Sequence, residues 1–132
     1  MSRLGVTLLV GALVCCGAAS EGVREYTQEE VLAVIDAGGS REGPLLLDVR
    51  SPGEYASGHL PGAVNIPFDE LPRRTEEIAE FRDRGVITYC ESGRRAGIAE
   101  ESLKSAGFRA IGDLQGHMRS WRARGLPTDR SK

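Results

Sequence analysis

The sequence predicts an α/β fold in three layers, with a small parallel sheet and helices on both of its faces. Two observations support this prediction. The segments that resemble strands are short, continuous apolar runs rather than alternating ones, as expected for strands that are buried on both faces. Segments of helical composition separate these runs, and strands that alternate with helices form parallel sheets.

The predicted elements follow one another along the chain. Thr27-Gln28-Glu29-Glu30 is a capping box that opens a helix with apolar residues at helical spacing, and Gly38-Gly39 ends this helix. Leu45 to Leu47 is a continuous apolar strand. Val86 to Tyr89 is another strand, rich in β-branched and aromatic side chains. The remaining elements are strands at residues 63–66 and 110–111 and helices at residues 70–84, 96–106 and 117–124.

Length and composition indicate one globular domain, which we place at residues 25–130. The chain has 132 residues, of which 40% are hydrophobic, and this is enough for a single core. The net charge is -2 and basic residues are interspersed with acidic ones, which argues against a surface that binds nucleic acid. No residues have the spacing of metal ligands. We expect a monomer.

The first 20 residues are predicted to be a secretory signal peptide. Arg3 supplies a positive start, residues 4–14 supply an apolar stretch, and Gly17-Ala18-Ala19-Ser20 supplies a small-residue cleavage site. The apolar stretch is shorter than the roughly 20 residues that span a bilayer. Cleavage after Ala19 or Ser20 would give a periplasmic or secreted protein with no stable membrane association.

The cysteines leave one alternative open for this segment. Cys15 or Cys16 could carry a lipid anchor, although bacterial lipoprotein signals require a small residue before the modified cysteine, and here Val14 or Cys15 precedes it. If the segment is removed, Cys90 is the only remaining cysteine. An unpaired thiol in an exported protein is a liability unless it is used, so Cys90 is a candidate reactive residue.

Cys90 follows a predicted strand and precedes the polar loop Glu91-Ser92-Gly93-Arg94-Arg95. Between the end of a strand and the start of a helix, successive backbone N–H groups form a concavity that binds anions. Arg94 and Arg95 add permanent cations, so we expect the loop to favour the thiolate and to attract an anionic substrate. The structural alternative is a buried cysteine that acts as a small hydrophobe, but that role does not require a glycine and two arginines nearby.

Three blocks of the sequence carry a resemblance to a known family. Cys90 to Arg95 fits the pattern Cys-x-x-Gly-x-Arg. Upstream lie Asp48-Val49-Arg50, Glu54-Tyr55 and Gly58-His59-Leu60-Pro61-Gly62-Ala63; downstream lie Leu114-Gln115-Gly116-His117, Trp121 and Gly125-Leu126-Pro127. Together these blocks resemble the rhodanese family over about residues 25–128, which implies a rhodanese-like three-layer fold. One departure is His117, which stands where a second glycine is usual.

The resemblance implies a sulfurtransferase. Cys90 would take sulfane sulfur from a donor such as thiosulfate, hold it as a persulfide and pass it to a thiol or cyanide acceptor, without a metal or an organic cofactor. The loop residues from Glu91 to Arg95 would bind the substrate, although the carboxylate of Glu91 opposes a thiolate. Two alternatives stay open. One is a rhodanese-like binding module without turnover; the other is a phosphatase or arsenate reductase of the same fold, whose arginine lies six positions after the cysteine, where this chain has Ala96.

The remaining polar candidates have less specific patterns. Asp48 and Arg50 either support the active-site edge or form an ion pair that closes a turn, and both interpretations stay open. Glu54 is expected to be a structural partner of an arginine. His59 and His117 are distant from Cys90 in sequence and are expected to be structural. Activation of the thiol is therefore expected from the helix and the arginines rather than from a general base.

Overall fold

The computed structural model describes residues 22–131, and the predicted signal peptide lies outside the described residues. The strands are β1 Arg24–Tyr26, β2 Leu45–Asp48, β3 Val64–Asn65, β4 Val86–Tyr89 and β5 Ile111–Leu114. The helices are α1 Gln28–Asp36, α2 Pro52–Ser57, α3 Leu71–Arg74, α4 Arg94–Ser105 and α5 His117–Ala123, with 3₁₀ helices η1 Gly39–Arg41 and η2 Thr75–Phe81. Among these residues, no helix is long and apolar enough to cross a bilayer.

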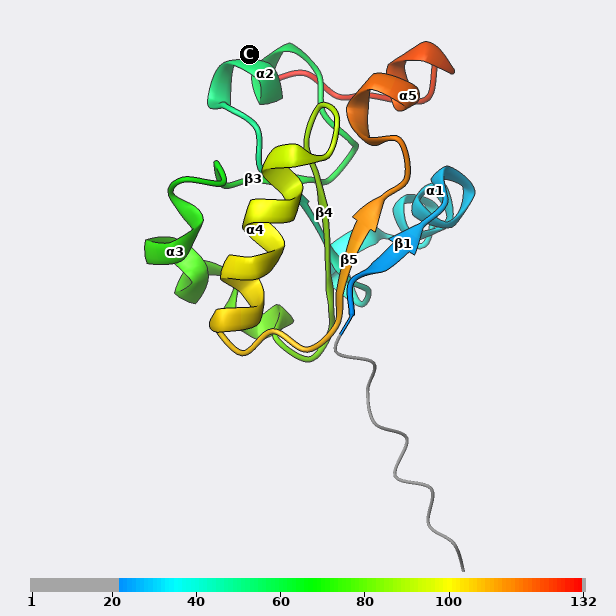
Figure 1. Ribbon diagram of the computed structural model, residues 1–132. Coiled ribbons are helices and arrows are strands. Elements are labelled where there is room, and N and C mark those ends of the chain that lie inside the picture. The colour runs from blue at the N-terminus through cyan, green and yellow to red at the C-terminus, as the bar shows by residue number, and fades with distance from the viewer. Residues whose placement is uncertain (1–21, 132) are drawn as a thin grey trace, which may run out of the picture.

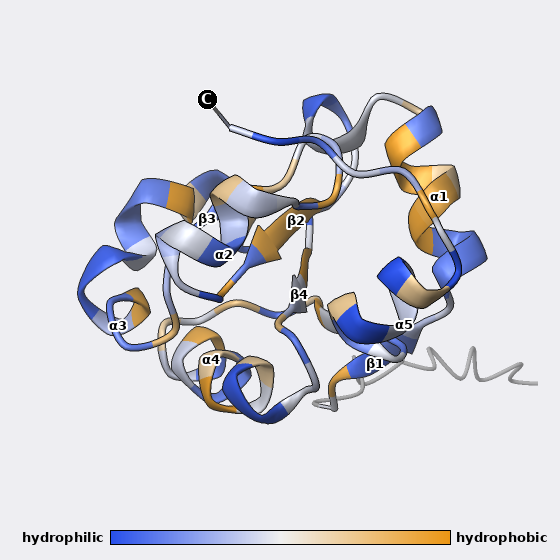
Figure 2. Ribbon diagram, turned by 90° about the horizontal axis from the view of Figure 1, so that it is seen from above, coloured by the Kyte–Doolittle hydropathy of each residue, from blue (hydrophilic) through white to orange (hydrophobic). Residues whose placement is uncertain are grey.

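The five strands form one parallel sheet in the order β1-β5-β4-β2-β3. Helices α3 and α4 cover one face of this sheet, and α1 and α5 cover the other (Figure 1 and Figure 2). Leu45 and Leu47 of β2 belong to the apolar cluster that lies under α4. Leu46 belongs to a separate apolar cluster on the other face, which also contains Trp121 of α5. Successive residues of a strand point to opposite faces, so both faces of β2 are buried. The three-layer α/β fold is confirmed.

Strand β1, helix α2 and the 3₁₀ helix η1 have no counterpart among the sequence-based predictions. Strand β1 is a polar strand at the edge of the sheet. Its Tyr26 ring packs over Gly112 of β5, where a Cβ would lie only 2.3 Å from Tyr26 Cε2. Helix α2 begins with a capping box in which Ser51 Oγ accepts from the Glu54 N–H and Glu54 accepts from the Ser51 N–H. The helix is only six residues long, so it lacks the apolar periodicity by which longer helices are predicted.

The helix predicted at residues 70–84 is instead divided between α3 and the 3₁₀ helix η2. Thr75, Ile78 and Phe81 are all buried. The segment is kinked at Ile78, whose φ of -121 and ψ of 22 are not helical, so it consists of two short turns rather than one regular helix. The kink therefore interrupts the continuous helix that the sequence predicts.

A buried carboxyl group, that of Glu100, lies between α4 and the sheet. The Thr88 hydroxyl donates to Glu100 Oε1 at 3.0 Å and also lies 3.2 Å from the carbonyl oxygen of Gly112. One hydroxyl proton cannot serve two acceptors fully. Burial raises the pKa of Glu100 to about 7. A protonated Glu100 donates to Thr88, which then donates to Gly112, so both hydrogen bonds form together.

We predict that Glu100→Gln gains stability relative to the wild type as the pH rises. Because the pKa of Glu100 is raised in the folded state, its contribution to stability is fully present below about pH 4.5 and is lost as the pH rises through about 7. Glutamine keeps a donor and does not titrate. Urea unfolding of both proteins should show a relative gain of about 2 kcal/mol between about pH 5 and pH 8. A difference in unfolding free energy between the two proteins that stays the same at both pH values would contradict the raised pKa of Glu100.

Candidate active site

Cys90 lies at the carboxyl edge of the sheet, directly after β4. The residue is 1% exposed, and its Sγ accepts a hydrogen bond from the Gly93 N–H at 3.0 Å. Gly93 has φ 116 and immediately precedes α4. A side chain is excluded there for two reasons, because the backbone is left-handed and because a Cβ would come within 3.0 Å of the His117 ring. The tight turn thus directs a backbone donor at the sulfur.

Arg94 and Arg95 lie in the first turn of α4 rather than in a loop, because the helix begins two residues earlier than the sequence predicts. Arg95 donates to both carboxylate oxygens of Glu54, at 2.7 and 3.0 Å, and this pairing lowers the pKa of Glu54 to about 2. Within residues 22–131, Arg94 is exposed and forms no ion pair. The first turn of α4 has no acidic residue. The partial positive charge at the amino terminus of α4 is therefore not offset there, and it adds to the full charge of Arg94.

His117 lies beside Cys90, so the expectation that no histidine adjoins the loop is wrong. Its Nδ1 accepts a hydrogen bond from the Cys90 N–H at 3.3 Å. The two residues are 27 positions apart, and they meet because β4 and β5 are neighbours whose carboxyl ends lie together. Burial lowers the pKa of His117. His59, in contrast, stacks on Tyr55 at 3.7 Å and bonds to the Tyr55 carbonyl, which is a structural role.

Asp48 and Arg50 form a buried ion pair at the end of β2. Arg50 Nε and Nη2 donate to the two carboxylate oxygens of Asp48, at 3.0 and 2.7 Å, and Nη2 also donates to the Gly58 carbonyl at 2.7 Å. Burial disfavours the charge of Arg50, but the bonds to Asp48 outweigh burial and raise its pKa. Arg50 Nη1 lies 3.9 Å from Glu91 Oε2. The pair therefore closes a turn and also reaches the loop that carries the thiol.

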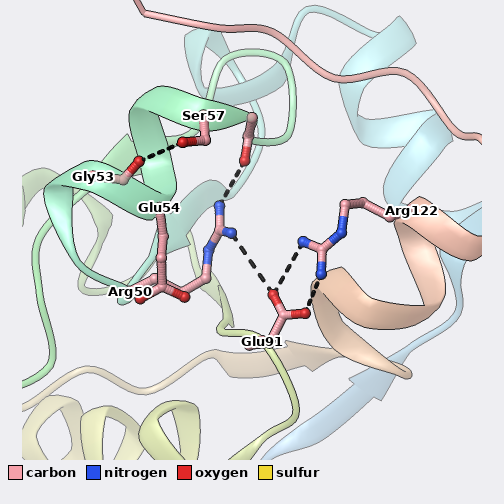
Figure 3. A pocket seen from close by; sticks show the side chains of 7 residues that line it. Arg50, Gly53, Glu54, Ser57, Glu91 and Arg122 are labelled. Carbon is pink, nitrogen blue, oxygen red and sulfur yellow. Dashed lines mark hydrogen bonds and ion pairs between the residues drawn. The ribbon is translucent and has the colours of Figure 1, made fainter.

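Glu91 is ion-paired rather than free in solvent. Arg122 of α5 donates to both of its carboxylate oxygens, one at 3.1 Å, so Glu91 lies between Arg122 and Arg50 (Figure 3). These groups border a cavity of about 530 Å³ next to the loop. Its walls are Arg50, Gly53, Glu54, Ser57, Gly58, Glu91 and Arg122. Acidic and basic side chains both line this cavity, and Cys90 directly precedes Glu91 in the sequence.

The expectation that Glu54 is the structural partner of an arginine is confirmed, and this arginine is Arg95. The structure also brings His117 and Arg122 to the loop around Cys90. The capping box of Ser51 and Glu54 is a sequence pattern from which the start of α2, and so the position of Glu54, could have been predicted. The histidine in place of glycine at position 117 was a second signal. Nothing in the sequence points to Arg122. Ser92 is exposed in the loop. Among residues 22–131, no three His, Cys, Asp or Glu side chains form a group that could hold a metal ion.

Fold and site together define a parallel α/β protein that carries a thiol on the loop after its central strand. Residues 27–124 match the model of the rhodanese-like domain, and the chain belongs to this family.

A sulfurtransferase from Allochromatium vinosum is 38% identical over 86 residues, which are 65% of this chain and 78% of that protein. Thiosulfate sulfurtransferase 16 of Arabidopsis thaliana is 33% identical over 96 residues, covering 65% of this chain and 80% of that protein. The crystal structure of a rhodanese-related protein from Thermoplasma volcanium matches with a TM-score of 0.66 and 30% identity, over 82% of this chain and 99% of that one.

We predict that Asp48→Asn destabilises the fold by roughly 3 kcal/mol, because it leaves the buried Arg50 guanidinium without its counter-charge. Glu30→Gln is the matched control, since the ion pair between Glu30 and Arg24 is exposed and should change stability by less than about 0.5 kcal/mol. Urea unfolding at neutral pH measures both. A loss at position 48 no larger than that at position 30 would show that the buried pair is not a structural support.

Proposed function

We propose that this protein is a sulfurtransferase that moves sulfane sulfur from a donor such as thiosulfate to a thiol or cyanide acceptor through a persulfide on Cys90. The observation that carries this proposal is the Gly93 N–H directed at Cys90 Sγ from 3.0 Å at the start of α4. A backbone donor and a helix amino terminus stabilise negative charge on sulfur. The same groups would serve the thiolate before transfer and the persulfide after it.

The proposed reaction has two displacements. The Cys90 thiolate attacks the outer sulfur of thiosulfate; the new bond joins Cys90 Sγ to this sulfur, and the sulfur–sulfur bond of thiosulfate breaks. Sulfite leaves with the electron pair of the broken bond. An acceptor thiolate or cyanide then attacks the terminal sulfur of the persulfide, and the Cys90 thiolate is regenerated. Charge and electrons balance in both steps.

The charges around the loop suggest how an anionic donor is oriented. Arg94 is the exposed cation of the first turn of α4, whereas Arg95 is held by Glu54. We infer that Arg94 attracts the donor. The N–H groups of the loop from Glu91 to Gly93 would hold the negative charge of the donor near the sulfur, while the charge of Arg95 is balanced by Glu54. Ser92 lies in this loop and would contact the bound donor.

Phosphate chemistry has less support from the same loop. The sixth residue after the cysteine is Ala96, which is fully buried on α4. A phosphoryl group would therefore lack a bidentate arginine at this position, and Arg95 is already engaged by both oxygens of Glu54. A binding module without turnover would leave Cys90 unmodified by thiosulfate, and this outcome separates it from a sulfurtransferase.

We predict that Cys90→Ser abolishes sulfur transfer with little change in stability, because oxygen cannot store sulfane sulfur and the change in volume is small. Intact-mass analysis after incubation with thiosulfate should show the gain of one sulfur atom in the wild type and none in the variant. Cyanide should remove the added sulfur. A wild type that gains no mass would favour the binding module, and turnover by Cys90→Ser would exclude the proposed intermediate.

A second prediction concerns Glu91, whose carboxylate pairs with Arg122 and so keeps this cation from an anionic donor. Glu91→Gln should lower the KM for thiosulfate about fivefold with little change in kcat, since it frees the positive charge of Arg122 beside the loop, and such a charge contributes on the order of 1 kcal/mol. Glu101→Gln is the matched control, because Glu101 is exposed on α4 and pairs only with Lys104. Steady-state kinetics measures both variants. A higher KM in Glu91→Gln would instead make Glu91 a substrate ligand.

A further inference from the structure

His117 is the one non-glycine residue among residues 22–131 with a positive φ, at 52°. This left-handed region favours glycine, because a side chain crowds the neighbouring carbonyl. His117 therefore adopts this conformation at a conformational cost. Such a cost at a site next to a reactive group calls for a compensating interaction.

The side chain of His117 reaches the loop that carries the thiol at two points. Its Nδ1 accepts from the Cys90 N–H at 3.3 Å. Its ring covers Gly93, since a Cβ at that position would lie 3.0 Å from Nε2 and 3.2 Å from Cδ2. Cys90 and Gly93 are also the two ends of the hydrogen bond from N–H to Sγ. The imidazole thus contacts both the residue that bears the sulfur and the residue that donates to it.

The backbone of α5 supports the same contact. The Met118 N–H donates to the Cys90 carbonyl at 3.0 Å, and the Arg119 N–H donates to the Glu91 carbonyl at 3.1 Å. These two bonds fix the start of α5 against the loop. The imidazole is 8% exposed and has little freedom to turn away. The position of its Nδ1 is therefore set by the fold rather than by a free rotamer.

We propose that His117 is a positioning residue for the Cys90 thiol, and this inference rests on the sulfurtransferase function proposed above. Nδ1 accepts from the Cys90 N–H, and the ring fills the space where a side chain at Gly93 would lie. Together these contacts keep the Gly93 N–H directed at the sulfur. His117 acts through these two residues rather than on the substrate.

The proposed role requires a neutral imidazole. Because Nδ1 accepts a hydrogen bond, the ring proton is on Nε2. A protonated ring would present an N–H at Nδ1 to the Cys90 N–H and would break the bond. The charged and titratable groups that face the ring are Asp113 of β5, Glu25 of β1 and Cys90 itself. Burial keeps the ring neutral by lowering its pKa, and the two carboxylates oppose this effect.

Two variants test the proposal. In His117→Asn, the side-chain oxygen occupies the place of Nδ1 and accepts the same hydrogen bond, and asparagine tolerates the left-handed backbone. In His117→Gly, the strain disappears together with the acceptor and the ring. We expect the single-turnover rate of persulfide formation from thiosulfate to fall roughly tenfold to a hundredfold in His117→Gly. We expect His117→Asn to stay within about fivefold of the wild type, because it keeps the acceptor.

The pH dependence gives a readout that a purely structural role would not change. We would measure the rate of Cys90 alkylation by iodoacetamide as a function of pH. In His117→Gly the midpoint of this profile should move upward by about one pH unit, because the Gly93 N–H is no longer directed at the sulfur. His117→Asn should lack the loss of reactivity at low pH that protonation of His117 causes in the wild type. His59→Asn is the matched control, since His59 is buried away from the loop and contacts Tyr55.

Three results would overturn the proposal. One is a wild-type rate in His117→Gly, and another is an equal loss of rate in both variants at position 117. The third is an alkylation profile of His117→Asn that matches the wild type at low pH, which decides the question even if His117→Gly does not fold. If the wild type takes no sulfur from thiosulfate, the proposed function fails, but the alkylation profiles still test the positioning role.

Discussion

The carboxyl edge of the sheet depends on the buried ion pair between Asp48 and Arg50. Neither charge can lie in the interior alone, because an unpaired buried charge costs several kcal/mol. Asp48 therefore fixes the Arg50 side chain, and Arg50 in turn binds the Gly58 carbonyl after α2 and approaches Glu91. Asn65 of β3 adds donors to the carbonyl oxygens of Asp48 and Arg50. Strand ends, helix α2 and the thiol loop are thus joined at one point.

Around the thiol, most of the charge is already paired. Arg95 is neutralised by Glu54 from α2, and Glu91 is neutralised by Arg122 from α5. The groups left to face an anion are the loop amides, the start of α4 and exposed Arg94. This arrangement suits a small negative charge on sulfur, which needs oriented dipoles more than a second full cation. It also explains how a carboxylate can lie directly beside Cys90, since its own charge is compensated.

Local sequence patterns predicted the fold where one element could form largely by itself. The all-leucine run of β2, the β-branched run of β4 and the capping box before α1 indicated their elements correctly. Patterns failed where a neighbour decides the structure. Strand β1 is polar and exists because β5 offers its edge and Gly112 makes room for Tyr26. Helix α3 gives way to η2, which kinks at Ile78 where the predicted helix would continue, and Thr75, Ile78 and Phe81 are buried in the fold.

The sequence by itself determined that a cysteine directly follows a buried strand and that a loop with a glycine three residues later separates it from a helix. These features are local in the chain, so their chemistry can be inferred from residue order. Only the tertiary structure decided that His117 receives the Cys90 N–H, that Glu54 holds Arg95 and that Arg122 holds Glu91. The sheet order places β5, β4 and β2 side by side. Their carboxyl ends, and the segments that follow them, therefore meet although they are distant in sequence.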